Sequence, residues 1–119
     1  MMIDEQNLFL ADIAKLIVKA QEMGFTITAG EMWRTPEQQA VYVKTGKSKT
    51  MNSRHLDRLA FDLNFFKDGK LAGTKAALQE LGDWWESLGP KNRWGGSWRG
   101  LIDSGKSTFV DVPHFERSV

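Results

Sequence analysis

The chain has 119 residues, of which 16 are Lys or Arg and 15 are Asp or Glu, and its net charge is +1. This length allows one compact domain with a hydrophobic core and leaves no room for two domains of ordinary size. The near-neutral charge excludes a global field that would draw the protein to nucleic acid or to an anionic membrane. The absence of cysteine excludes disulfides, thiolate catalysis and cysteine-based metal sites. Any metal must therefore be held by histidine and carboxylate.

The first 30 residues have the wrong composition for a signal peptide or a membrane span. Asp4 and Glu5 stand where a secretory signal carries Lys or Arg, and Lys15, Lys19 and Glu22 interrupt the apolar positions. We therefore expect a soluble protein that stays in the cytoplasm of the cell that makes it, without stable membrane insertion.

The first predicted elements are a helix and a strand. Apolar residues at three- and four-residue steps predict an amphipathic helix that ends at Gly24. Those residues are Leu8, Leu10, Ile13, Leu16, Ile17, Ala20 and Met23. Alternation of apolar residues with threonine then predicts a short strand over residues 25–29.

A second helix should follow directly. Thr35 supplies an N-cap, Pro36 stands at the first helical position and Gln38 lies three residues after the cap, so this helix should run to about Thr45. Arg34 is left at the junction of strand and helix, where its side chain can point into a cleft. A surface salt bridge is the equally good alternative for this arginine.

The middle of the chain predicts a loop and a hairpin. Residues 46–54 are polar and lack periodicity, which is typical of a loop. Alternating apolar residues predict a strand over residues 59–66, and Asp68-Gly69 is a turn signal before a short return strand at residues 70–71.

The last third predicts one more helix and a terminal strand. Thr74 can cap a helix that ends at Gly89-Pro90, and the tryptophans at 84 and 85 should form core and groove wall. Residues 91–108 are glycine-rich and irregular, and residues 109–117 resemble a short strand. Together the elements predict a small α+β domain, residues 1–119, in which about three helices flank an antiparallel sheet.

The strand over residues 59–66 carries an acid in its middle. Because side chains alternate along a strand, Asp62 projects from the face opposite the apolar one. The apolar face consists of Leu59, Phe61, Leu63 and Phe65. Burying a carboxylate on the other face is costly unless it is paired or bound to a cation.

The chain has only two histidines, His55 and His114, and both lie near carboxylates. A lone histidine is usually a surface or hydrogen-bonded core residue, but two beside acids favour a site. His55 precedes Asp62 by seven residues, so it must reach that face of the strand from the preceding loop. Asp111 precedes His114 by three residues, and Pro113 between them indicates a bend that could bring both into one cleft.

Where a protein has no cysteine, a catalytic zinc ion is typically held by two histidines and one carboxylate, with a fourth position open for water. His55, Asp62 and His114 fit that set. Asp111 is the candidate general base for a water attacking a carbonyl. Arg34, permanently charged, is suited to stabilise the negative charge that develops on the carbonyl oxygen.

At these residues the sequence resembles the M15 zinc peptidases. This group contains D-alanyl-D-alanine carboxypeptidases, VanX-type dipeptidases and phage L-alanyl-D-glutamate endolysins. The first motif runs from Ser53-Arg54-His55 to Asp62, and the second is Asp111-Val112-Pro113-His114-Phe115-Glu116. The segments Trp33-Arg34-Thr35-Pro36-Glu37-Gln38-Gln39 and Trp94-Gly95-Gly96 also match.

The resemblance implies a DD-peptidase- and Hedgehog-like fold, zinc on the three ligands above, Asp111 as base and Arg34 beside the scissile carbonyl. It implies substrate-binding roles for Ser53, Gln38, Trp94 and Trp98. Glu116 is expected behind the ligands, and it becomes the candidate base if Asp111 is not. Asp111 replaces the glutamate of many members, which marks an endolysin-like subgroup.

We therefore expect a zinc endopeptidase that cuts the L-Ala–D-Glu bond of the peptidoglycan stem peptide during phage lysis. It should act as a monomer, wait in the host cytoplasm and reach the periplasm and cell wall once a holin opens the membrane. The alternatives are a D-Ala-D-Ala carboxypeptidase or dipeptidase of the same fold and a noncatalytic wall-binding virion protein. The basic residues Lys44, Lys47, Lys49 and Arg54 could bind the wall, or they could simply belong to a solvated loop.

Overall fold

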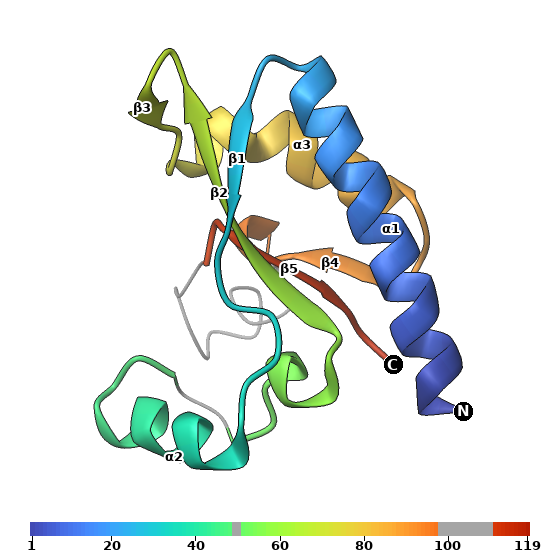
Figure 1. Cartoon of the computed structure of the whole chain (residues 1–119), viewed down its shortest axis with the longest axis vertical. Helices are drawn as coiled ribbons and strands as arrows, with labels where there is room; N and C mark the ends of the chain where they lie inside the picture. The colour runs from blue at the N-terminus through green and yellow to red at the C-terminus, as the bar shows by residue number, and fades with distance from the viewer. Residues whose placement is uncertain (49–50, 98–110) are drawn as a thin grey trace.

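Residues 1–48, 51–97 and 111–119 are described by the structure, a computed structural model of the chain (Figure 1). The elements are α1 (Met2–Glu22), β1 (Thr26–Ala29), α2 (Pro36–Lys44), η1 (Arg54–Asp57), β2 (Ala60–Lys67), β3 (Lys70–Leu71), α3 (Lys75–Ser87), β4 (Asn92–Trp94), η2 (Gly95–Ser97) and β5 (His114–Arg117), where η marks a 3₁₀ helix. Across these ranges, no helix is both long and apolar enough to cross a membrane.

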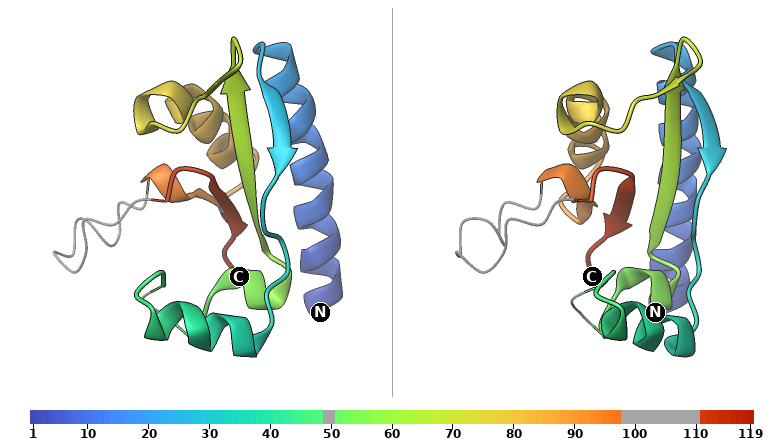
Figure 2. Two further views of the ribbon diagram at one scale, coloured as in Figure 1. Left: turned by 60° about the vertical axis from the view of Figure 1, so that its left-hand side comes forward. Right: turned by 90° about the vertical axis from the view of Figure 1, so that its left-hand side faces the viewer.

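The strands form one antiparallel sheet in the order β1-β2-β5-β4, and β3 pairs with the far end of β2. β2 is central, because it pairs with β1 along one edge and with β5 and β3 along the other. Figure 2 shows α1 running alongside β1 and β2, with α2 and η1 together at the end opposite the β2–β3 turn. The fold is α+β, as the sequence predicts.

The hydrophobic core lies between the sheet, α1 and α3. Phe9 of α1 meets the Trp85 ring edge-on at 5.9 Å, and Phe115 of β5 contacts both Trp85 and Phe65 at 5.8 Å. The apolar face expected for β2 is confirmed, since Leu59, Leu63 and Phe65 are buried and Phe61 packs against the core.

The helix ends follow the local signals in the sequence. The Thr35 hydroxyl accepts the Gln38 main-chain N–H at 3.1 Å, and the Thr74 hydroxyl accepts that of Ala77 at 3.1 Å. Each bond satisfies a helix N–H that has no partner inside the helix. Gly24 follows α1 with φ +92°, a left-handed conformation that glycine adopts without strain.

Three short elements were not predicted. η1 begins at Arg54, the last residue of the expected loop, and β4 and η2 lie within the segment expected to be irregular. These three elements lack the alternating run that indicates β1 and the turn signal that indicates β3. Their positions matter, because η1 carries His55.

The contact between α3 and Trp94 gives a test of the core. A Cβ on Gly82 would overlap the buried Trp94 ring. We expect Gly82→Ala to lower the free energy of unfolding by about 1–2 kcal/mol, because overpacking costs about 1–3 kcal/mol and the better helix propensity of alanine offsets at most about 1. Urea denaturation measures the change. Gly73→Ala, whose Cβ would make ordinary contacts at 3.6 Å, is the control, and equal stability of the two variants would contradict this packing.

Glu5 joins α1 to the other end of the chain. Its carboxylate accepts from Arg117 Nε and lies 3.1 Å from Lys91 Nζ. The hydrogen bonds from Arg117 and then Lys91 lower the pKa of Glu5 below the usual 4.5.

A lowered folded-state pKa stabilises the fold above the unfolded-state value, and this contribution is lost as the pH falls through the folded-state value. We therefore expect Glu5→Gln to melt below the wild-type protein at neutral pH, with the difference shrinking as the pH falls below about 4.5. Thermal melts of both proteins across this range measure the effect. A melting-temperature difference independent of pH would show that the charge of Glu5 has no such role.

Candidate metal centre and active site

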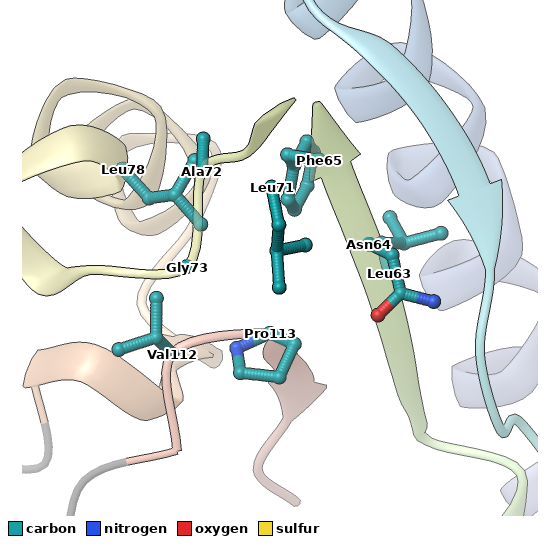
Figure 3. A pocket seen from close by; sticks show the side chains of 9 residues that line it. All are labelled: Leu63, Asn64, Phe65, Leu71, Ala72, Gly73, Leu78, Val112 and Pro113. Carbon is teal, nitrogen blue, oxygen red and sulfur yellow. The ribbon is translucent and has the colours of Figure 1, made fainter. Parts of the chain in front are cut away.

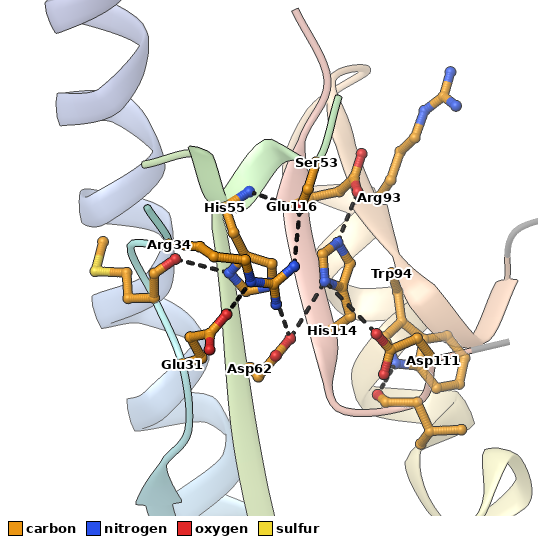
Figure 4. Close-up of polar contacts among 12 residues, drawn as sticks. Glu31, Arg34, Ser53, His55, Asp62, Arg93, Trp94, Asp111, His114 and Glu116 are labelled. Atoms are coloured by element: carbon orange, nitrogen blue, oxygen red, sulfur yellow. Dashed lines mark hydrogen bonds and ion pairs between the residues drawn. The ribbon is translucent and has the colours of Figure 1, made fainter. Parts of the chain in front are cut away.

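The pairing of β2 with β5 places Asp62 opposite His114. Directly opposed residues of an antiparallel pair project from the same face, so these side chains meet although 52 positions separate them in the sequence. His114 Nδ1 lies 3.3 Å from Asp62 Oδ1 (Figure 4). The Leu63 N–H donates to the Pro113 carbonyl at 3.0 Å and holds the register at this point.

His55 reaches the same carboxylate from η1. Ser53 caps η1 by accepting the His55 main-chain N–H at 3.2 Å. The ring Nδ1 lies 2.7 Å from the Met32 carbonyl oxygen, which can only accept, so Nδ1 carries the proton and Nε2 presents its lone pair. Nε2 lies 3.2 Å from Asp62 Oδ1, yet it is buried without a hydrogen-bond partner in the part of the chain described. A buried nitrogen in this condition fits a metal ligand.

Glu116 lies behind His114. The Nε2–H of His114 donates to Glu116 Oε1, and the two atoms are 2.7 Å apart. The other ring nitrogen, Nδ1, faces Asp62. A carboxylate in this position fixes the ring and raises its basicity as a ligand. Burial lowers the pKa of His114, but the hydrogen bonds with Asp62 and Glu116 outweigh it and raise the pKa to about 9. The surroundings of this ring therefore favour positive charge.

One oxygen of Asp62 and one nitrogen from each histidine lie within 4.8 Å of one another. Burial raises the pKa of Asp62, but the imidazoles of His114 and His55 outweigh it and hold the pKa well below its usual range, so the carboxylate is ionised. Two imidazole nitrogens and one carboxylate oxygen form a donor set that suits zinc and related transition-metal ions. The three residues predicted as ligands are therefore close enough together to hold one metal ion.

Asp111 stands at the rim of this group. Its Oδ2 lies 3.9 Å from His114 Nδ1, and its side chain is 33% exposed. Burial raises the pKa of Asp111 above its usual value, although the charge of His114 opposes this effect. A carboxylate of raised pKa that still reaches solvent is suited to take up and release a proton.

Gly95 and Trp94 support the turn that carries Asp111. The Asp111 N–H donates to the Gly95 carbonyl at 3.0 Å, and a Cβ on Gly95 would overlap the Asp111 carbonyl. The Trp94 indole N–H donates to the Val112 carbonyl at 2.7 Å, and its ring is buried. Trp94 therefore lies beneath the site, and its contact with substrate stays a prediction.

A β-bulge at Gly30 and Glu31 wraps the chain around Asp62. The Gly30 N–H donates to the Asp62 carbonyl and the Asp62 N–H to the Glu31 carbonyl, both at 2.8 Å, so two residues oppose one. Only glycine fits here, since a Cβ on Gly30 would lie 2.7 Å from the Asp62 oxygen. Beyond the bulge, the Arg34 N–H donates to the His55 carbonyl at 3.2 Å. The segment 30–34 thus holds two of the three candidate ligands, Asp62 and His55, through its main chain.

Arg34 is held by several side chains (Figure 4). Its Nε donates to Glu31, and its NH1 donates to Gln39 at 2.7 Å and to Ser53 at 3.4 Å. The guanidinium also lies 4.6 Å from the centre of the Tyr42 ring. The Arg34 side chain is only 10% exposed and that of Glu31 30%, so this ion pair is largely buried. A contact of Arg34 with the scissile carbonyl stays a prediction.

Gln39, and not Gln38, contacts Arg34. The main-chain N–H of Gln38 serves the cap of α2, whereas Gln39 is fully buried and its amide also donates to Ser48 at 2.8 Å. The sequence carries a signal for the contact between Gln39 and Arg34, because Gln39 lies five positions after Arg34 on the first turns of a capped helix. The predicted substrate contact of Gln38 stays a prediction, and Trp98 lies outside the described residues.

A pocket of about 170 Å³ lies next to the turn that precedes β5. Figure 3 shows it between β2, the chain after β3, α3 and the turn before β5. Its lining comprises Leu63, Asn64, Phe65, Leu71, Ala72, Gly73, Leu78, Val112 and Pro113. Val112 and Pro113 belong to the turn between Asp111 and His114, but neither Asp111 nor any of the three candidate ligands lines the pocket. Because none of the lining residues is charged, the pocket suits a small apolar group and not an anion.

The sequence profile of the family described as phage L-alanyl-D-glutamate peptidase matches residues 3–117. The chain belongs to this family. The L-alanyl-D-glutamate peptidase of Listeria phage A118 is 36% identical over 106 residues, which cover 86% of this chain and 34% of that protein. The chain therefore spans about a third of the length of this relative.

A solved structure shows the same fold. It is the crystal structure of Serratia marcescens L-Ala D-Glu endopeptidase ChiX, with a TM-score of 0.66 and 23% sequence identity. The match covers 91% of this chain and 79% of that one. Similarity of this degree supports the α+β fold of this chain.

The position of Glu116 predicts an effect on metal affinity. We expect Glu116→Gln to weaken the binding of a transition-metal dication about 10- to 100-fold, because the ring of His114 loses its anionic partner. Competition with a chromophoric chelator measures the affinity. Glu80→Gln, at an exposed position of α3, controls for the loss of one negative charge. Equal affinities of the two variants would remove Glu116 from the metal centre.

Proposed function

We propose that the protein is a zinc-dependent peptidoglycan endopeptidase that hydrolyses the bond between L-Ala and D-Glu of the stem peptide. The observation that carries this proposal is the group formed by His55, Asp62 and His114 beside Asp111, in a chain that belongs to a peptidase family. The curated relative and the similar solved structure carry names of the same specificity.

Each residue of the site has a role in this reaction. A zinc ion on the three ligands would polarise the scissile carbonyl and lower the pKa of a bound water. Asp111 takes the proton of the attacking water and delivers it to the departing amine, which its raised pKa favours. Arg34 donates hydrogen bonds to the carbonyl oxygen as negative charge develops there. Glu116 and the Met32 carbonyl orient the two imidazoles.

The proposal extends to substrate contacts, to the oligomeric state and to the place of action in the cell. Ser53, which already contacts Arg34, would help to hold the stem peptide, and Gln38, Trp94 and Trp98 would line or support its groove. We infer that residues 1–119 act as one catalytic domain and as a monomer. The protein would wait in the host cytoplasm and act on the cell wall after a holin has opened the membrane.

Digestion of purified Gram-negative peptidoglycan, followed by mass spectrometry of the fragments, tests the proposed function. Peptides that begin with D-Glu, with L-Ala left on the muramic acid, are the expected products. Release of free D-Ala or of D-Ala-D-Ala would instead assign the fold to a carboxypeptidase or dipeptidase. Unchanged muropeptides in the presence of zinc-loaded protein would favour a noncatalytic wall-binding protein.

Two substitutions separate metal binding from proton transfer. We expect His114→Ala to lose zinc and activity together, because it removes a ligand. Asp111→Asn should keep zinc but lose about 10²- to 10⁴-fold in kcat, the usual contribution of a positioned base. Zinc content by atomic absorption and turnover of the same preparations measure both effects. If Asp111→Asn retained full turnover, the base would be reassigned to Glu116.

A further inference from the structure

The contacts of Arg34 use a definite part of its hydrogen-bonding capacity. A guanidinium has five N–H donors: one on Nε and two on each terminal nitrogen. The Nε donor goes to Glu31, and the two NH1 donors are directed to Gln39 and Ser53. Across the described ranges, no bond from NH2 to another residue is found, so its two donors remain for a ligand.

Glu31 holds Arg34 together with Tyr42. One carboxylate oxygen of Glu31 accepts from Arg34 Nε, and the other accepts the Tyr42 hydroxyl at 2.9 Å. The Tyr42 ring also lies against the guanidinium at 4.6 Å. The hydrogen bond with Glu31 raises the pKa of Tyr42, so the hydroxyl remains a donor. Glu31 thus accepts one hydrogen bond from the Arg34 guanidinium and one from the hydroxyl of Tyr42, whose ring stacks on that guanidinium.

We propose that Glu31, supported by Tyr42, is the positioning residue that fixes the Arg34 side chain so that its NH2 donors face the scissile carbonyl. An unrestrained arginine loses rotamer entropy when it is fixed in one conformation, and donors that are already oriented need no rearrangement as charge develops on the carbonyl oxygen. The inference rests on the proposed function, in which Arg34 stabilises that oxygen.

Glu31 can be tested without disturbing the metal centre. Its main-chain carbonyl, and not its side chain, accepts the Asp62 N–H. Glu31→Gln therefore keeps the β-bulge and the shape of the side chain while removing the negative charge paired with Nε. Tyr42→Phe keeps the stacked ring and removes the second bond of the carboxylate. Glu80→Gln, at an exposed position of α3, is the matched control for charge.

A double-mutant cycle separates positioning from a general structural role. With a soluble muropeptide that contains the L-Ala–D-Glu bond as substrate, we expect Glu31→Gln to lower kcat roughly 10- to 100-fold. KM, zinc content and melting temperature should change little. In an Arg34→Ala background the same substitution should change kcat less than about twofold, because the guanidinium that Glu31 positions is absent. Equal losses in both backgrounds would overturn the proposal.

A second measurement does not depend on activity. The Arg34 Nε–H should give a resolved, slowly exchanging NMR signal in the wild-type protein that broadens or exchanges rapidly in Glu31→Gln and is unchanged in Glu80→Gln. If the wild-type protein cuts the muropeptide but Glu31→Gln is equally active, the positioning role fails and the proposed function stands. If the wild-type protein cuts no peptidoglycan, the proposed function fails, and an unchanged Arg34 signal would then reject the positioning contact as well.

Discussion

The register between β2 and β5 is the constraint on which the site depends. With Asp62 opposite His114, two candidate ligands from distant parts of the sequence share one face of the sheet. A shift of one residue would turn Asp62 toward the core and bring Leu63 onto the site face. The apolar residues prevent this slip, because Leu63 and Phe65 are buried against α1 and α3. The packing that stabilises the fold therefore also sets the geometry of the ligands.

The segment between β1 and α2 completes the site. With its bulge in place, the Glu31 carbonyl accepts the Asp62 N–H and the Met32 carbonyl accepts a hydrogen bond from the His55 ring. The Arg34 N–H donates to the main-chain carbonyl of His55. One stretch of chain thereby positions two candidate ligands and Arg34. Main-chain groups are suited to this role because they are held by the sheet and have few ways to relax. The third candidate ligand, His114, receives its support from the side chain of Glu116 on the same strand, β5.

Much of this could be predicted from local chemistry. The caps at Thr35 and Thr74 and the alternation along β2 are encoded within a few residues, and each appears in the structure. The three ligands could be proposed because a chain with two histidines and no cysteine has few ways to bind a transition metal. Their meeting in space agrees with that proposal.

Other features depend on tertiary contacts that no local pattern encodes. η1 is a single turn whose position is set by the Ser53 cap and by bonds to the segment before α2. The Met32 carbonyl is a main-chain group, so residue type gives no signal for it. The burial of Trp94 beneath the Asp111 turn is likewise set by contacts that lie far from it in the sequence. The bond between the Tyr42 hydroxyl and Glu31 forms only once α2 folds back toward the segment before it.

Anomalous diffraction at the zinc absorption edge, from crystals of the zinc-loaded protein, tests the central claim most directly. One strong peak should lie in contact with His55 Nε2, Asp62 Oδ1 and His114 Nδ1, with Glu116 still bonded to the other nitrogen of His114. A peak elsewhere, or one that lacks any of these three atoms as a ligand, would contradict the account.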